Sequence, residues 1–165
     1  MTRLTRHIRA PREAVYRALV DADAVRRWMV PDNMTSQIHE FQAHEGGKFR
    51  ISLTYDDPAR RGKTAANTDT FHGRFVKLVP TEEVVQVVEF ESDDLSMAGE
   101  VTISYVLTGV GGGTEVLTTH ENLPSGIHPS ANELGTRMSL DKLAKLVEAE
   151  TIKPDSAGQL RGIVE

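Results

Sequence analysis

The sequence predicts a single α+β domain, in which a seven-stranded antiparallel sheet is accompanied by two short N-terminal helices and one long C-terminal helix. Three observations support this prediction. A strand-like segment runs directly into two helical segments before residue 31, six segments of alternating polar and apolar residues follow between about residues 34 and 123, and an amphipathic helical pattern comes last. At 165 residues the chain is about one domain long.

The N-terminal region contains one predicted strand and two predicted helices. TRLTRHIRA alternates polar and apolar residues as a strand does, and APREAVYRALV follows it with Pro11 in the first turn, where proline is compatible with a helix. A second, shorter helix, DADAVRRW, can be capped by Asp21 or Asp23 and ends before Pro31. The expected order is therefore strand, helix and short helix.

The middle region is predicted to form six successive strands that are separated by turn residues. The segments are TSQIHEFQA, KFRISLTY, TFHGRFVKLV, EEVVQVVEF, EVTISYVLTG and TEVLTTHENL. Six strands in succession indicate antiparallel hairpins. Together with the N-terminal strand they give a sheet of seven strands.

The glycine-rich segment between the last two strands raises the alternative of a phosphate-binding loop. Such a loop has the pattern G-x-G-x-x-G between a strand and a helix, so that backbone N–H groups face the phosphates. Here Thr114 stands where the third glycine is needed, and a strand follows rather than a helix. We therefore interpret Gly109 to Gly113 as the turn of a hairpin.

The last predicted helix has a recognisable start and an apolar stripe. Ser130 followed by Glu133 has the pattern of a capping box. Apolar residues at i, i+3, i+4 and i+7 then form one face, namely Leu140, Leu143, Ala144 and Val147. Proline and glycine interrupt the pattern further on, so we expect a domain over residues 1–150 and a C-terminal tail over residues 151–165.

Composition argues against several classes of function. With no cysteine, the chain has no disulfide, no thiolate nucleophile and no cysteine-ligated zinc. The net charge of −5, with Lys and Arg scattered among acidic residues, argues against nucleic-acid binding. No apolar run suffices for a membrane span or a secretory signal, so we expect a cytoplasmic protein. His39 and His44 are not spaced as metal ligands, and we expect neither a metal nor a cofactor.

The segment APREAVYRALVDADAVRRWMVP resembles the helix-to-tryptophan opening of the START-like SRPBCC superfamily, and within it the AHSA group, named after the activator of the heat-shock-protein ATPase. The resemblance continues through Gly46-Gly47 with KFRI, through FHGRFVKLVPTEEVV, and through GGGTEVLTTH to the last helix, so it covers residues 4–150. It implies a helix-grip fold, in which the long helix lies across a curved sheet and encloses a cavity. Where the group often has Gly-Trp near the start of the last helix, this chain has Gly135-Thr136, which removes an aromatic wall.

Three polar residues are expected on the inner face of the sheet. Alternation groups Thr118 and His120 with Val116 on one face of their strand, and the apolar residues of the preceding strand place Tyr105 on the inner face too. A polar group there needs a partner, because an unpaired buried polar atom is costly. The partner is either internal, for example in a hydrogen bond between Tyr105 and His120, or a small, mostly apolar ligand whose orientation these residues fix.

The leading interpretation is a protein that binds a small hydrophobic or amphipathic molecule between the sheet and the C-terminal helix, as the resemblance implies. The candidate ligand-binding residues are Trp28, Phe49, Ile51, Phe71, Phe90, Ile103, Tyr105, Thr118, His120, Leu134 and Met138. In a protein without a cavity, the aromatic residues and Met138 serve equally well as core residues.

Two alternatives follow from the same resemblance. One is an enzyme similar to polyketide cyclases or hydrolases, with His120 or Tyr105 as general acid or base. Because no nucleophile and no second base stand out, we assign no catalytic residue. The other is a co-chaperone-like partner of a heat-shock ATPase with a role in the stress response, which predicts an exposed apolar patch rather than a cavity. The sequence is compatible with a monomer or a homodimer.

Overall fold

The computed structural model describes residues 1–57, 59 and 67–152. Within these residues seven strands form one sheet in the order β1-β7-β6-β5-β4-β3-β2, and every neighbouring pair is antiparallel. The strands are β1 (Thr2–Ile8), β2 (Met34–Phe41), β3 (Lys48–Tyr55), β4 (Thr68–Val79), β5 (Glu83–Phe90), β6 (Val101–Val110) and β7 (Gly113–Glu121). The helices are α1 (Arg12–Val20), α2 (Ala22–Trp28), the 3-10 turn η1 (Leu95–Met97) and α3 (Pro129–Ile152). The predicted α+β class and order of the main helices and strands are confirmed.

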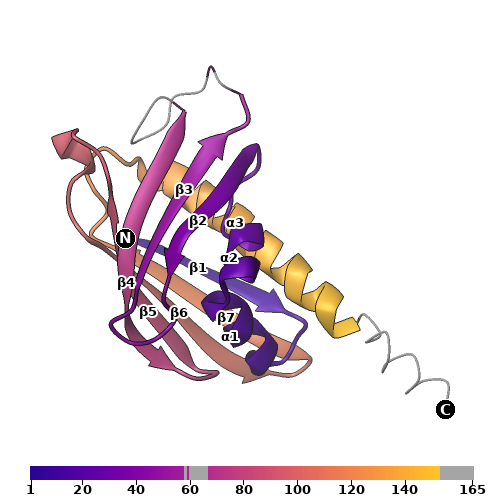
Figure 1. Ribbon diagram of the computed structural model, residues 1–165. Coiled ribbons are helices and arrows are strands. Elements are labelled where there is room, and N and C mark those ends of the chain that lie inside the picture. The colour runs from indigo at the N-terminus through magenta and orange to yellow at the C-terminus, as the bar shows by residue number, and fades with distance from the viewer. Residues whose placement is uncertain (58, 60–66, 153–165) are drawn as a thin grey trace, which may run out of the picture.

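The sheet curls round α3, which crosses it diagonally beside α1 and α2 (Figure 1). The chain passes from β1 at one edge through α1 and α2 to β2 at the other edge, and then returns strand by strand to β7. The antiparallel register shifts between Ile38 and Glu40 in β2 and between Phe75 and Lys77 in β4. Such bulges bend a strand and increase its twist, which helps the sheet to curl.

The main apolar core lies between the concave face of the sheet and the C-terminal half of α3. Three residues of the predicted stripe, Leu143, Ala144 and Val147, have no exposed surface. They belong to one cluster of buried side chains that includes Leu4 and Ile8 of β1. This packing fixes the C-terminal half of α3 against β1, and at the other end of the helix Asn132 also reaches Thr2 of β1.

The start of α3 differs from the predicted capping box. The helix begins at Pro129, and Nδ1 of the preceding His128 pairs with the hydroxyl of Ser130 at 2.7 Å. Ser130 therefore lies inside the first turn, and Glu133 forms an ion pair with Arg137 instead of reaching back to the cap. Proline is favourable at the first helical position because its missing N–H has no partner there, which explains the earlier start.

The glycine-rich segment forms the predicted hairpin. Val110 pairs with Gly113, so that Gly111 and Gly112 make a two-residue loop, in which Gly112 has a φ of 80°. A Cβ atom on Gly113 would collide with the carbonyl oxygen of Ile8. Glycine at this position therefore allows β1 to lie alongside β7, and the segment has a structural role.

The C-terminal helix ends at Ile152, close to the predicted end of the domain at residue 150. The remainder of the predicted tail, residues 153–165, lies outside the described residues. Among the helices that the structure describes, none combines the length and the apolar character needed to span a membrane.

Candidate functional site

A cavity of about 500 Å³ lies between the concave face of the sheet and the N-terminal half of α3. Its walls come from β3 to β7, from the segment between α2 and β2, from the loop before α3, and from α3 itself. Cavities that bind small molecules commonly have volumes in this range. Eight of the predicted binding residues line it, namely Trp28, Phe71, Phe90, Ile103, Tyr105, His120, Leu134 and Met138.

The other three predicted binding residues, Phe49, Ile51 and Thr118, are buried but are not among the residues that line the cavity. The Phe49 ring packs against Phe75 with centroids 5.2 Å apart, and Phe41 meets Phe75 edge-to-face at 5.5 Å. These aromatic rings therefore fill the core at the same face of the sheet.

Trp28 and the segment that follows it form a fixed wall of the cavity. The indole N–H of Trp28 donates to the carbonyl oxygen of Ala18 at 2.8 Å, and its ring meets Tyr105 edge-to-face at 6.1 Å. Further on, the Lys142 ammonium of α3 donates to the carbonyl oxygen of Val30 at 2.7 Å, which ties this segment to the helix. The wall is thus held in place by hydrogen bonds within the protein.

The N-terminal half of α3 forms the mouth of the cavity. Leu134 lines the cavity although 56% of its surface is exposed. Gly135 follows it, and a Cβ atom built on this glycine has no other atom within 4 Å. Open space therefore lies where most other residues would place a side chain.

His120 is the central polar residue of the cavity wall. The side-chain N–H₂ of Asn132 in α3 donates to Nδ1 of His120 at 3.1 Å and to the hydroxyl of Thr2 at 3.0 Å. Asn132 is therefore an internal partner of the His120 ring, where the sequence suggested Tyr105 as one example. The other ring nitrogen, Nε2, is buried and has no hydrogen-bond partner among the described residues. Nε2 is thus a buried polar atom of a cavity-lining residue that no described residue pairs with.

Burial keeps the His120 imidazole and the Tyr105 phenol of this wall uncharged at neutral pH. Removal from water lowers the pKa of His120 to about 4. The same cause raises the pKa of the Tyr105 hydroxyl, so this group stays protonated. A neutral imidazole and a neutral phenol can orient a ligand through hydrogen bonds without bringing a charge into an apolar cavity.

Three of the polar cavity residues that sequence reasoning missed are Asp69 in β4, Gln86 in β5 and Asn132 in α3. All of them share the periodicity of the apolar residues around them. Gln86 alternates in phase with buried Val84 and Val88, and Asn132 lies two helical turns before Leu140. A polar residue in phase with an apolar face was therefore the available signal.

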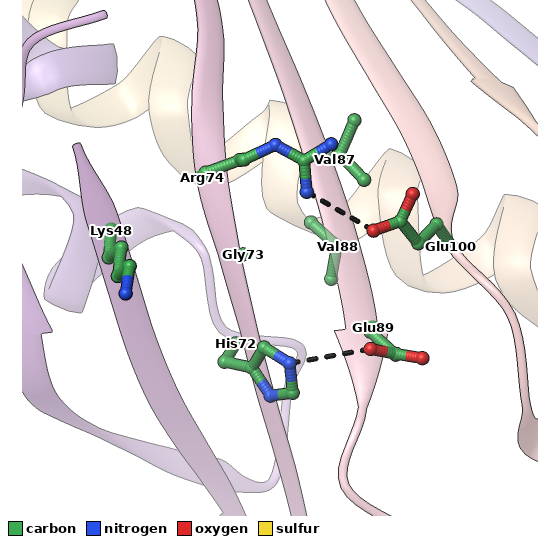
Figure 2. Close-up of a pocket in the computed structure, with 8 residues that line it drawn as sticks. All are labelled: Lys48, His72, Gly73, Arg74, Val87, Val88, Glu89 and Glu100. Atoms are coloured by element: carbon green, nitrogen blue, oxygen red, sulfur yellow. Dashed lines mark hydrogen bonds and ion pairs between the residues drawn. The ribbon is translucent and has the colours of Figure 1, made fainter. Parts of the chain in front are cut away.

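A shallow depression of about 190 Å³ lies on the face of the sheet opposite α3 (Figure 2). Its charged side chains pair with one another: His72 with Glu89 at 3.4 Å, and Arg74 with Glu100 at 3.1 Å. Each of these four side chains is about half exposed, so water also satisfies it. Within the described residues no group of three or more His, Asp or Glu side chains is placed to hold a metal ion. The inner cavity is therefore the stronger candidate site.

Thr118→Val is expected to raise the free energy of unfolding by about 1 kcal/mol. The Thr118 side chain is fully buried and its hydroxyl has no hydrogen-bond partner among the described residues, whereas valine has nearly the same shape and no polar atom to satisfy. Urea denaturation measures the difference.

Thr114→Val on the same strand is the matched control. The Thr114 hydroxyl is equally buried but donates to the carbonyl oxygen of Ala10 at 2.7 Å, so we expect a loss of about 1 kcal/mol. If both substitutions changed the free energy of unfolding in the same direction, the hydrogen-bonding state of the hydroxyl would not explain the stability change of Thr118→Val.

Comparison with known proteins identifies relatives of this chain. The model of the family described as activator of Hsp90 ATPase homolog 1-like protein matches residues 9–148. A crystal structure of a Chromobacterium violaceum protein is 30% identical and covers 88% of this chain and 95% of its own, with a TM-score of 0.79. The solution structure of the AHSA1-like protein from Aeromonas hydrophila is 19% identical, with a TM-score of 0.67 and coverage of 90% and 92%.

A third solved structure shares only the fold. DynU16, a protein of the dynemicin biosynthetic locus, is 17% identical with a TM-score of 0.64, and the match covers 91% of this chain but 48% of DynU16. No curated protein is significantly similar to the sequence. The relatives therefore support the helix-grip architecture, while the chemistry of the site has to be argued from this chain's own residues.

Proposed function

Since the chain belongs to the family of activator of Hsp90 ATPase homolog 1-like proteins, and contains a cavity of about 500 Å³, we propose that it binds a small hydrophobic or amphipathic molecule between its sheet and α3. The observation that most supports this proposal is the unpaired Nε2 of His120 in the wall of a largely apolar cavity. Apolar cavities with a few well-placed polar groups are typical of sites for small ligands.

Apolar contacts supply most of the proposed affinity. Each Å² of apolar surface that ligand and cavity bury contributes roughly 25 cal/mol, against the loss of the ligand's translational and rotational freedom. The proposed contact residues are those that line the cavity, with Phe71, Phe90 and Ile103 on the sheet and Met138 on the helix. His120 sets the orientation of the ligand, because only a correctly placed polar atom satisfies Nε2.

Binding is favoured over acid–base catalysis by the state of His120. A general base works best when its pKa lies near the working pH, whereas burial lowers the pKa of His120 to about 4. The ring is held by the Asn132 amide rather than by a carboxylate that would stabilise its charged form. The geometry therefore suits a hydrogen bond to a ligand better than proton transfer.

Binding is also favoured over recognition of a partner protein by the distribution of exposed apolar residues. The large hydrophobic side chains that are exposed among the described residues are Met1, Val76, Leu95, Val110 and Leu134, and they lie on separate elements. Single exposed hydrophobic residues are normal on a protein surface, whereas docking sites gather them into a patch. Leu134 alone adjoins the cavity.

Native mass spectrometry of the protein purified from its host is expected to show a stoichiometric small-molecule adduct. The released compound can then be added back while the emission of Trp28, which is the one tryptophan of the chain and lines the cavity, is recorded. We expect the emission to change because a bound ligand alters the surroundings of the indole ring in the cavity wall. A purely apo mass, with no emission change from a library of lipids and aromatic compounds, would contradict the proposed function.

A further inference from the structure

The orientation of Asn132 determines which atom of His120 carries the proton. Its side-chain N–H₂ contacts two acceptors, the hydroxyl of Thr2 at 3.0 Å and Nδ1 of His120 at 3.1 Å. Because Nδ1 accepts this hydrogen bond, the single proton of the neutral imidazole is on Nε2. Nε2 is therefore a hydrogen-bond donor, and no acceptor for it exists among the described residues.

His120 lies in a row of side chains that crosses the concave face. It is opposite Ile103 in β6, and Ile103 is opposite Gln86 in β5, so all three point to the same side of the sheet. His120 is 8% exposed and Gln86 4% exposed, and both line the cavity. With strands about 4.8 Å apart, the two polar residues stand roughly 10 Å from each other across an apolar residue. This spacing fits a compact ligand with an apolar body and a polar end.

The charges of the wall favour an uncharged ligand. Among the described lining residues there is no lysine and no arginine, and the two charged ones, Asp32 and Asp69, are acidic. The described lining residues therefore offer no cation to a carboxylate, sulfate or phosphate, and burying an unpaired anion is costly. A neutral acceptor can use the Nε2 donor without that cost.

We propose that the ligand is an uncharged carbonyl compound, such as a ketone, ester or amide, whose carbonyl oxygen accepts a hydrogen bond from Nε2 of His120. This inference rests on the proposed function, since it names the ligand class of the same cavity. The carbonyl oxygen supplies the acceptor that the protein lacks, and the apolar remainder of the molecule occupies the space between Ile103 and α3.

Three aromatic probes of similar size test the proposal: 2-acetylnaphthalene, 2-ethylnaphthalene and 2-naphthoate. Their dissociation constants are measured by displacement of the uncharged dye N-phenyl-1-naphthylamine. We expect the ketone to bind about five- to tenfold more tightly than the hydrocarbon, as one added hydrogen bond allows. The carboxylate is expected to bind at least about tenfold more weakly than the ketone.

Two variants localise the effect. In His120→Phe, which keeps an aromatic ring but has no donor, the preference for ketone over hydrocarbon is expected to fall to about one. In Thr118→Val, which changes a residue outside the cavity lining, the preference is expected to stay as in the wild type. If the dye does not bind to the wild type at all, the proposed function fails. If the dye binds but ketone and hydrocarbon compete equally, or the carboxylate competes best, the carbonyl proposal alone is overturned.

Nitrogen NMR of the labelled wild-type protein provides a test that does not depend on the folding of a variant. The His120 ring is expected to carry its proton on Nε2, and this resonance is expected to shift with 2-acetylnaphthalene but not with 2-ethylnaphthalene. A proton on Nδ1, or the same shift with both compounds, would overturn the proposal.

Discussion

Gly135→Phe is expected to weaken binding of N-phenyl-1-naphthylamine at least about tenfold, which corresponds to about 1.4 kcal/mol of binding free energy. Gly135 lines the cavity, and a Cβ atom there has open space around it, so a phenyl ring can extend into the volume that the ligand needs. Folding is expected to be preserved, because phenylalanine has a higher helix propensity than glycine by a few tenths of a kcal/mol. Dye titration and urea denaturation of the same sample measure both effects.

Lys145→Phe is the matched control for this substitution. Lys145 is exposed on the C-terminal half of α3 and does not line the cavity. The substitution introduces the same ring on the same helix but outside the cavity. We therefore expect dye affinity within about twofold of the wild type. Equal loss of affinity in both variants would show that the phenyl ring acts through general destabilisation. Unchanged affinity in Gly135→Phe would show that the ligand does not use the space beside this glycine.

Most of the fold was predictable because strands and helices carry their burial in the periodicity of their apolar residues. The alternation along β7 placed Thr118 and His120 on the inner face, and both are buried there. The spacing of Leu143 and Val147 likewise identified the buried side of α3. These patterns are local, so a single sequence contains them.

The boundary between core and cavity was not predictable from the same patterns. Phe49 and Phe71 are both inward-facing aromatic residues on neighbouring strands, yet only Phe71 lines the cavity. Phe49 instead packs against Phe75, with its ring close to Gly73, where a Cβ atom would collide with it. Periodicity tells which face of a strand is buried, but what covers that face depends on residues brought together from distant parts of the chain.

The partner of His120 was hidden from the sequence for a related reason. Asn132 contacts Thr2, 130 positions away in the chain, and this contact exists only once α3 lies over the edge formed by β1 and β7. The requirement that a buried polar atom be paired was correctly recognised for His120. Which side chain meets the requirement, and which nitrogen is left without a partner, follows from the placement of the helix.

Acidification from pH 7 to pH 4 is expected to lower the stability of the fold by about 3 kcal/mol through His120 alone. In the unfolded chain its pKa is near 6.5, whereas burial lowers it to about 4 in the folded protein. The unfolded state therefore takes up a proton first as the pH falls. The contribution of His120 is fully present above pH 6.5 and is lost progressively between pH 6.5 and pH 4, where urea denaturation can follow it.

His120→Gln is the comparison that isolates this contribution, because glutamine keeps a polar side chain but does not titrate. Several carboxylates, including Glu91 and Asp94, also have lowered pKa values and destabilise the fold in acid, but they are present in both proteins. The difference between wild type and variant should therefore shrink by about 1.4 kcal/mol per pH unit below pH 6. Parallel stability curves from pH 7 to pH 4.5 would mean that His120 is not held neutral by burial, and the assignment of its proton to Nε2 would lose its basis.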